Sequence, residues 1–427
     1  MFKTGIKDRE TIQYLLSQGG FSFLFRMFAM VFSFISMWFI TNFYGEADYG
    51  TYALALTVLQ ILAMVFALGV PNAFVSFAGR IDNVEKLKGL LLKSGAIVLI
   101  SSLFPILCFS FGAQFFSETV FQKPSLLNYF LVVSFSIPFM IFHEIICYYF
   151  ISVKKIIAYG LFFYIFPSVS FALFLVAFYY YNLTGFFTFL AYVSSIILTV
   201  LIALVVLFYK KTKITFPEIR SKEILKKSFP MMVSGIFLIL LNWTDILMLG
   251  RIESESQIGI YNTAFKLGYL TLFFVLSMNV IIMPKVAALF HQNNFSEMKK
   301  VINRSTQLVI VFTIPLAIGI IFFSENILRL FGEGFIAGKT TLILITLGAL
   351  FNAMTGNVDQ ILNMTNHQKG VRNIFLFGFL MNVALNLGLI PSYGIEGAAL
   401  ASLITNVVVN IVFVIVIKKK LGFFTFM

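Results

Sequence analysis

Four charged side chains lie inside long apolar runs of the sequence: Arg26, Glu144, Asp245 and Lys266. An ionisable group in such surroundings is costly unless it is paired or hydrated, so it is a candidate for binding or transport. A guanidinium or ammonium group there could hold a phosphate, and a carboxylate could take up H⁺ or Na⁺. Asp359 is a further acidic residue, nearer the edge of its apolar run.

Neutral oxygen-bearing side chains recur near the C-terminal end of the chain. Asn382 and Asn386 are spaced i,i+4 and therefore share one face of a helix, and Ser402 with Thr405 lies in the next apolar run. Amide and hydroxyl oxygens suit a hard cation. The alternative is that these groups only hydrogen-bond between neighbouring helices.

His143 precedes Glu144 directly, and an imidazole that titrates near neutral pH next to a carboxyl group could form a proton relay. The alternative is packing or hydration at a helix end. The other histidines, His291 and His367, are far away in sequence and lack the spacing of metal ligands, so we expect no metal centre. Cys108 and Cys147 both fall in apolar runs and are expected to be reduced packing residues.

The composition indicates whether these groups lie in a water-soluble domain or in a lipid bilayer. Hydrophobic residues make up 59% of the chain and charged residues 11%, with a mean hydropathy of +0.95. A water-soluble domain cannot bury that much apolar surface, so the sequence predicts an all-α integral membrane protein. No small-residue cleavage signal follows the charged first 18 residues, so we expect the first span to be retained.

A bilayer core about 30 Å thick needs roughly 20 apolar residues per helix. Windows of that length predict about twelve transmembrane helices, at 19–40, 52–78, 89–114, 126–151, 156–178, 186–208, 229–250, 258–284, 303–323, 340–363, 372–391 and 395–417. Short turns, YYYNLTG and PSYGIEG, separate the fifth span from the sixth and the eleventh from the twelfth. Each of these pairs is predicted to be a tight helical hairpin with glycine at its turn.

Positive charge in short loops stays on the cytoplasmic side of the membrane. With both termini inside, 25 of the 31 Lys and Arg residues fall in cytoplasmic segments. The outer turns hold four, namely Lys123, Arg251, Arg329 and Lys339. The net charge of +13 is thus explained by topology and anionic lipid, without nucleic acid as a partner.

The polar segment 209–228 divides the chain into two predicted six-helix lobes, 1–208 and 229–427. The lobes echo one another, because ADYGTYALA at 47–55 aligns with SQIGIYNTA at 256–264, and NLTGFFTFL at 182–190 aligns with GIEGAALAS at 394–402. Two such repeats inserted in the same orientation predict a substrate site between them, in a central cavity.

Four stretches also carry a resemblance: FYGEADYGTYALALTVLQIL, TDILMLGRIESESQIGIYNTAFKLG with the later Pro284, PLAIGIIFFSENILRLFGEGF, and NVALNLGLIPSYGIEGAALASLITN. In their order and spacing the chain resembles the polysaccharide-export flippases of the multidrug/oligosaccharidyl-lipid/polysaccharide (MOP) exporter superfamily, which share the MATE-like two-lobe fold. The resemblance implies a multi-pass protein of the bacterial inner membrane. It would flip an oligosaccharide on a polyprenyl-pyrophosphate carrier, such as an O-antigen unit, to the outer leaflet.

The resemblance also assigns roles. Arg26 and Lys266 are expected to contact the substrate phosphates, and Asp245, Asn382, Asn386 and Ser402 to bind the coupling ion. Some lipid-linked flippases of the superfamily have a similar arrangement, in which an Asp of the seventh helix and polar residues of the last two helices bind Na⁺. Asn386 stands where an acid can occur in those relatives. The only cofactor expected is this Na⁺ or H⁺. The protein is expected to work as a monomer, associated with glycan-assembly proteins.

Each charged candidate has a structural alternative. Asp245 and Lys266 lie at similar estimated depth, so they could neutralise one another as an ion pair, and Arg26 and Glu144 could do the same. Arg26 could also extend to the inner interface. The rival functions are a cation-coupled multidrug antiporter of the same superfamily and a membrane glycan polymerase. The short outer turns leave no room for the catalytic segment of a polymerase, so we expect no enzyme.

Overall fold

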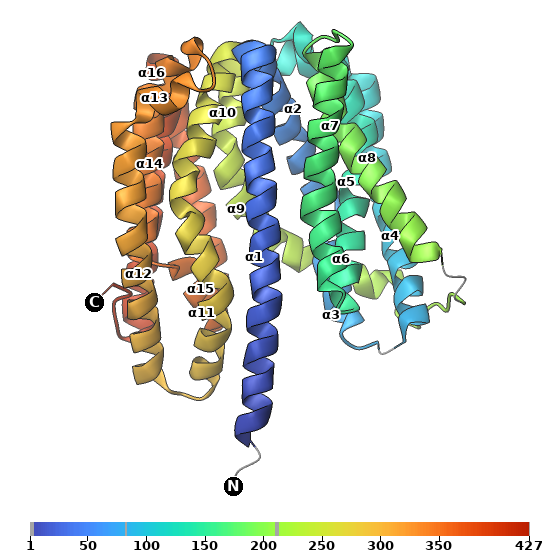
Figure 1. The fold of residues 1–427 in the computed structure, drawn as a ribbon, viewed down its shortest axis with the longest axis vertical. Coiled ribbons are helices and arrows are strands. Elements are labelled where there is room, and N and C mark those ends of the chain that lie inside the picture. The colour runs from blue at the N-terminus through green and yellow to red at the C-terminus, as the bar shows by residue number, and fades with distance from the viewer. Residues whose placement is uncertain (1–3, 82, 210–212, 427) are drawn as a thin grey trace. The chain divides into compact units, whose positions relative to one another are not determined.

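The computed structural model describes residues 4–81, 83–209 and 213–426, and the elements in these ranges are all helical. The elements in order are α1 (Thr4–Phe43), α2 (Gly45–Phe66), α3 (Val70–Ala78), α4 (Val84–Gln114), η1 (Phe115–Val120), η2 (Pro124–Leu126), α5 (Leu127–Ser152), α6 (Ile156–Gly160), η3 (Leu161–Ile165), α7 (Phe166–Tyr180), α8 (Phe186–Phe208), α9 (Ser221–Ile252), α10 (Glu255–Tyr269), η4 (Leu270–Leu272), α11 (Phe273–His291), α12 (Phe295–Phe322), α13 (Ser324–Arg329), η5 (Glu333–Gly338), α14 (Lys339–Thr355), α15 (Val358–Met364) and α16 (Gln368–Leu421) (Figure 1). The prediction of an all-α membrane protein is confirmed.

Ten helices of the described chain are long and apolar enough to cross a membrane, and a bent pair within α9, Ser221–Phe237 and Ile239–Ile252, makes an eleventh. The sequence predicted about twelve. Both the eleventh and the twelfth predicted span lie in α16, which is counted once although its backbone breaks at Gly394. α9 begins at Ser221, inside the segment that was predicted to be a linker.

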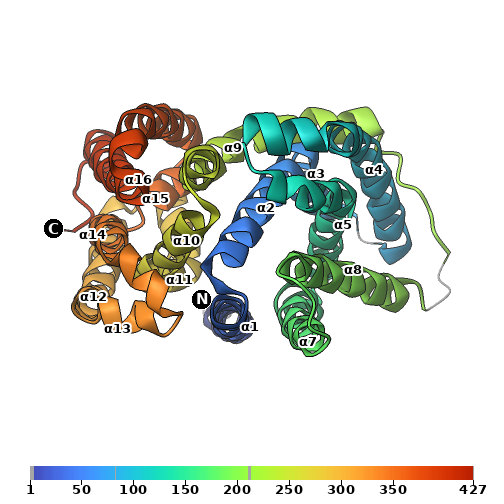
Figure 2. The same cartoon turned by 90° about the horizontal axis from the view of Figure 1, so that it is seen from above.

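The chain divides into two compact units, Met1–Ile236 and Phe237–Met427. In the first unit α4 packs on α5 and α7 packs on α8, and α5 also contacts α2, α3 and α8. In the second unit α14 packs against α10, α12 and α16 (Figure 2). Each unit therefore has its own helical core.

Residues 213–220 are held along the start of α4. The Lys93 ammonium group donates to the backbone oxygens of Pro217 at 2.6 Å and of Ile219 at 3.1 Å. Lys88 is buried and donates to the Leu207 oxygen at 2.7 Å. Gly89 makes room for this packing, because a Cβ there would lie 2.2 Å from the Thr215 oxygen. These two lysines thus bind backbone oxygens, in addition to the topological role that their sequence position predicts.

The break in α16 depends on two glycines. Gly394 has a φ of 54° and a ψ of −131°, a conformation that strongly favours glycine. At Gly397 a Cβ would lie 2.3 Å from the Leu389 oxygen, which is a backbone atom that cannot easily move. The glycine turn predicted from PSYGIEG is therefore present. Gly378 lets the two arms of α16 approach closely, since a Cβ there would lie 2.6 Å from the Val409 side chain.

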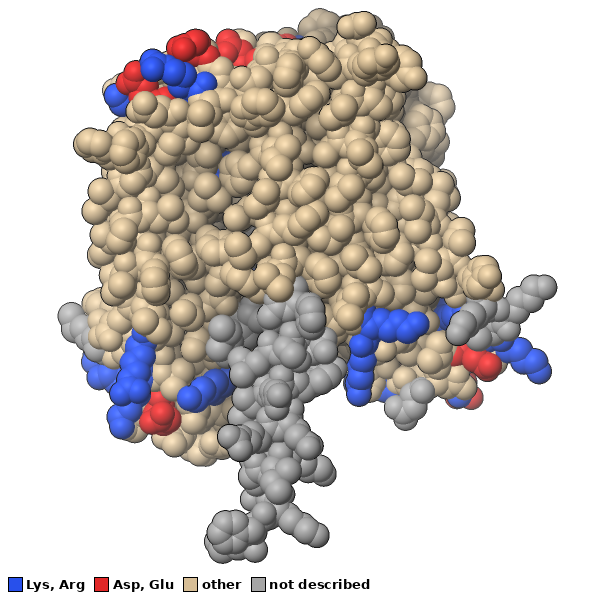
Figure 3. All heavy atoms as spheres, in the orientation of Figure 1, with Lys and Arg blue, Asp and Glu red and all other residues tan. Residues whose placement is uncertain are grey.

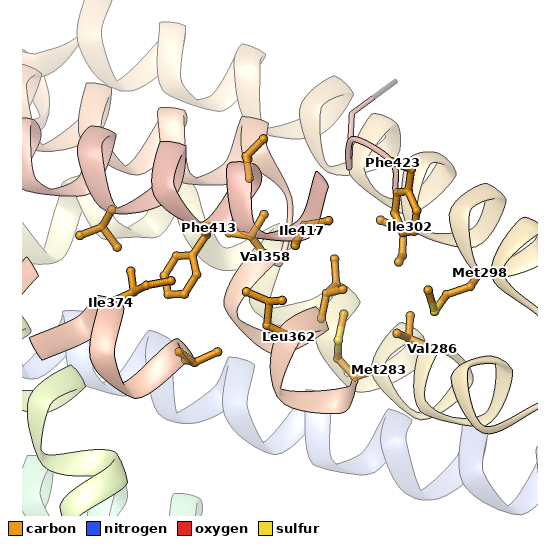
Figure 4. Packing of buried hydrophobic residues seen from close by; sticks show 14 of the residues in the cluster. Met283, Val286, Met298, Ile302, Val358, Leu362, Ile374, Phe413, Ile417 and Phe423 are labelled. Carbon is orange, nitrogen blue, oxygen red and sulfur yellow. The ribbon is translucent and has the colours of Figure 1, made fainter. Parts of the chain in front are cut away.

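A large apolar cluster fills one end of the second unit (Figure 4). It combines side chains of α11, α12, α15, α16 and the segment after α16: Met283, Val286, Met298, Ile302, Val358, Leu362, Ile374, Phe413, Ile417 and Phe423. Burying an aliphatic or aromatic side chain of this size contributes about 1.5–3 kcal/mol. The cluster fixes the end of α16 that carries Lys418, Lys419 and Lys420.

Few charged side chains are visible along the middle of the helices on the face drawn in Figure 3. On the face drawn in Figure 3, Lys and Arg gather at the lower ends of the helices and a broad band above them is almost free of charge. At the upper end, over α13, Arg329 pairs with Glu325 at 3.4 Å and with Glu333 at 3.3 Å. This distribution agrees with helices that cross a bilayer.

Candidate functional site

Asp245 lies within the second unit, in the α9 segment Ile239–Ile252, and only 1% of its surface is exposed. Its carboxylate accepts hydrogen bonds from three neutral donors. The Tyr261 hydroxyl of α10 lies 2.6 Å from Oδ2, the Asn386 Nδ2 of α16 lies 2.7 Å from Oδ1, and the Ser402 hydroxyl also donates to Oδ2. Hydrogen bonds to an ionised group are the strong ones, so this arrangement stabilises a buried carboxylate.

The two asparagines predicted to share a helical face are joined to one another. Asn386 Nδ2 also lies 3.0 Å from Asn382 Oδ1, and both side chains are fully buried. The predicted residues Asp245, Asn382, Asn386 and Ser402 therefore lie in one cluster, which α9, α10 and the two arms of α16 assemble.

A small, mostly polar pocket adjoins this cluster. Its lining is Leu241, Asn242, Phe265, Tyr269, Asn382, Ser402, Thr405 and Asn406. Among the described residues, Asn386 Oδ1 and Thr405 Oγ1 are buried and have no hydrogen-bond partner. An unsatisfied buried oxygen costs about 1–3 kcal/mol, so these atoms are available as ligands. With the Asp245 carboxylate, these atoms give the second unit several buried oxygens in and beside the cluster.

Lys266 is not among the groups that contact Asp245 in the described part of the chain. α10 begins at Glu255, earlier than predicted, which places Tyr261 at the depth of Asp245 and Lys266 five residues further along. At 1.5 Å per residue this is a difference of about 8 Å. Asp245 is thus bound by neutral donors, and the half-buried Lys266 lies deeper on the same helix.

Arg26 belongs to the first unit and lies on α1. Its Nε donates to the Tyr164 hydroxyl at 2.9 Å, and its guanidinium carbon lies 5.9 Å from the centre of that ring. No other hydrogen bond of this exposed side chain is recorded among the described residues, so Nη1 and Nη2 remain available. Glu144 shares a side-chain hydrogen bond with Tyr148, and a direct pair of Arg26 with Glu144 stays a prediction.

Tyr164 is positioned by a turn of π-helix, Leu161–Ile165, between Gly160 and Pro167. A π turn displaces backbone oxygens from their usual partners, and such turns are frequent at functional sites. His143 compensates here, because its Nε2 lies 2.8 Å from the Phe162 oxygen. The recorded contacts of His143 are with Phe162 and Phe163, on which it stacks, and the relay with Glu144 stays a prediction.

Several residues of these sites were not anticipated from the sequence. Tyr261 and Asn406 in the second unit, and Tyr164 and Tyr148 in the first, are of types that recur in many of the predicted spans. The one available signal was depth, since Asp245 lies nine residues before Ser254, in the turn that joins α9 to α10, and Tyr261 lies seven residues after it. The tyrosines around Arg26 left no such signal, because 17 tyrosines are spread along the chain.

Comparison with known proteins gives the family. A family model described as "Polysaccharide biosynthesis protein" matches residues 15–290, and one described as "MatE" matches residues 230–387. Two relatives come from Haloferax volcanii. The probable low-salt glycan biosynthesis flippase Agl15 is 27% identical over 162 residues, which is 38% of this chain and 34% of that protein. The probable flippase AglR is 25% identical over 181 residues, or 42% and 38% of the two chains. The matched region thus spans little more than a third of each relative.

Solved structures share the fold along nearly the whole chain. An inward-facing multidrug resistance MATE family transporter of the MOP superfamily has a TM-score of 0.75 at 16% identity, covering 92% of this chain and 94% of its own. The lipid II flippase MurJ, in an inward closed conformation, has a TM-score of 0.74 at 18% identity, covering 92% and 87%. The first is described as a transporter and the second as a flippase. With the family model matching well over half of the residues, the chain belongs to the polysaccharide biosynthesis protein family.

Proposed function

We propose that the protein flips a polyprenyl-pyrophosphate-linked oligosaccharide, such as an O-antigen or other surface polysaccharide unit, from the inner to the outer leaflet. The movement is driven by a cation in an alternating-access cycle. Support comes from the family, from two probable flippases among the relatives, one of them a glycan biosynthesis flippase, and from the buried carboxylate site of the second unit. That site is the single observation on which the proposal of ion coupling rests.

The donors around Asp245 favour Na⁺ over H⁺ as the coupling ion. A proton needs only the carboxylate, whereas Asn382, Asn386, Ser402 and Thr405 add neutral oxygens that a hard cation prefers. The orphan oxygens of Asn386 and Thr405 would gain a partner when a cation binds. Such a gain of ligands makes the loaded and unloaded states of the second unit differ in energy, as coupling requires.

Arg26 is the proposed anion contact of the first unit. Its Nε is fixed on Tyr164, and the two Nη groups present a planar fork that matches two phosphate oxygens. Lys266 is proposed as the second cationic contact, from α10. A pyrophosphate carries more than one negative charge, so two cations suit it better than one.

We further propose that the protein lies in the cytoplasmic membrane of a bacterium with both termini inside, acting as a monomer beside glycan-assembly proteins. The two-sided charge distribution supports this orientation. Single cysteines at Ser221 and Ser254, both exposed, test it in a background lacking Cys108 and Cys147. An impermeant thiol reagent added outside should label position 254 and leave 221 unlabelled. Labelling at position 221 would mean that the orientation is the opposite of the proposed one.

The substrate is tested in cells that lack the gene. We expect lipid-linked oligosaccharide to accumulate in the inner leaflet and surface polysaccharide to fall, and the intact gene to reverse both effects. A multidrug antiporter of the same superfamily is the alternative, and the MatE match over residues 230–387 is what favours it. That alternative predicts normal surface polysaccharide and increased sensitivity to cationic drugs instead.

A further inference from the structure

A row of polar side chains leads away from the Asp245 site inside the second unit. It begins at Ser402 and continues at Asn406 and Asn410, at i,i+4 spacing on the second arm of α16. Thr355 of α14 and Thr425 of the segment after α16 extend it. We infer that this row is the route by which the coupling cation passes between the Asp245 site and the basic end of the second unit. The inference rests on the proposed coupling role of Asp245.

The two asparagines of the row are oriented in the same way. Asn406 Nδ2 donates to the Ser402 backbone oxygen at 3.0 Å, and Asn410 Nδ2 donates to the Asn406 backbone oxygen at 2.8 Å. Each amide thus bonds a backbone oxygen of its own helix through its NH₂ group, and the Asn410 carbonyl oxygen accepts from the Thr355 hydroxyl. The two amides are separated by one turn of helix, about 6 Å.

The row is continuous at both ends. Asn406 and Ser402 line the pocket that also contains the unpartnered Thr405 hydroxyl, which is 2% exposed. At the other end the Thr355 hydroxyl shares its proton between the Asn352 oxygen at 2.8 Å and Asn410 Oδ1 at 3.1 Å. Thr425 donates in turn to the Thr355 backbone oxygen at 2.5 Å. From Ser402 to Asn410 the row covers about 12 Å of helix.

The surroundings make this row unusual. Asn410 is 4% exposed, Thr355 6% and Thr425 fully buried, and the neighbouring side chains Val409, Phe413 and Phe423 belong to the apolar cluster (Figure 4). Polar groups are costly in such a core, and valine or leucine would fill the same space. The cluster surrounds the far end of the row and keeps bulk water out. Passage of a cation is therefore slow and depends on each oxygen of the row.

The five named members of the row are Ser, Asn and Thr residues, so they carry amides and hydroxyls and no carboxyl or imidazole group. It therefore suits a metal cation better than a proton relay. The alternative explanation is that these groups only hold α14 to α16 by hydrogen bonds. The two explanations differ in what they predict for rates, because a helix-packing role affects stability and leaves cation exchange unchanged.

Thr355→Val and Asn410→Leu test the route, and Thr346→Val is the matched control. Thr346 is buried on the same helix, and its hydroxyl bonds only the Leu342 oxygen of that helix among the recorded contacts. In a Trp38→Phe background Trp243, two residues from Asp245, is the one remaining tryptophan. Its fluorescence on rapid mixing of the purified full-length protein with NaCl, against choline chloride, reports the binding and release of sodium.

We expect Thr355→Val and Asn410→Leu each to slow association and dissociation by about tenfold or more, with Kd unchanged, because a lost ligand raises the barrier and not the final state. Thr346→Val should leave both rates as they are. Unchanged association and dissociation rates in folded Thr355→Val would overturn the route. A changed Kd with an unchanged association rate would also overturn it, because the residue would then belong to the binding site itself. If the wild-type protein gives no sodium-dependent fluorescence change, or if Asp245→Asn gives the same change as the wild type, the coupling proposal is overturned instead.

Discussion

Asp245→Asn is expected to lower export of the glycan by at least about tenfold while the protein reaches the membrane at close to its normal level. The replacement keeps the size and one carbonyl oxygen, so Tyr261 and Ser402 keep an acceptor. A neutral amide binds Na⁺ far more weakly than a carboxylate, and each tenfold loss of affinity is about 1.4 kcal/mol. Surface polysaccharide and the sodium-dependent fluorescence of Trp243 measure the two effects.

Tyr261→Phe and Lys266→Met separate this role from a structural one. Tyr261→Phe removes one donor to the carboxylate, which costs about 1.5–3 kcal/mol of stability but leaves the anion for sodium. We expect that variant to keep its sodium response. Adding Lys266→Met to Asp245→Asn should not restore export. Full restoration in the double variant would mean that Asp245 serves only to neutralise Lys266, and the coupling role would be lost.

Arg26→Ala is expected to reduce export at least about tenfold, since two charge-assisted hydrogen bonds to phosphate are lost, each contributing about 1.5–3 kcal/mol. Arg26→Lys should recover part of the activity, because an ammonium group supplies charge without the planar fork. The measurement is surface polysaccharide at matched protein level. The sodium response of Trp243 should be unchanged in both variants, because Asp245 and Arg26 belong to different units.

Arg80→Ala is the matched control, since Arg80 is an exposed arginine of the same unit that follows α3 in a predicted cytoplasmic loop. It should export normally. Tyr164→Phe keeps the guanidinium but removes its partner at Nε, so we expect a smaller loss than in Arg26→Ala. Normal export by Arg26→Ala would remove this residue from the substrate site.

The helical membrane fold was predictable because apolar length and the positions of Lys and Arg depend on the bilayer and not on detailed packing. The cluster of Asp245, Asn382 and Asn386 was also accessible from the sequence, since helix periodicity sets which side chains share a face. The glycine turn at Gly394 followed from the same kind of local rule. All three features are set by short segments of the chain.

The partners of the charged groups were not predictable in the same way. Lys266 was placed at the depth of Asp245 because the start of α10 was taken three residues too late, and at 1.5 Å per residue such an error exchanges one partner for another. The link from Arg26 to Tyr164 depends on a π turn at Leu161–Ile165, which no simple periodicity indicates. Tertiary partners and local helix irregularities therefore needed the structure.

The most direct test of cation-driven flipping uses the purified protein in proteoliposomes that contain a fluorescent polyprenyl-pyrophosphate oligosaccharide. An impermeant quencher reports the leaflet in which the fluorophore lies, and a sodium gradient or a pH gradient is imposed separately. We expect the sodium gradient to accelerate movement between leaflets in the wild-type protein and to have no effect in Asp245→Asn. Movement that is equally fast without any gradient, or equally accelerated in Asp245→Asn, would contradict the account.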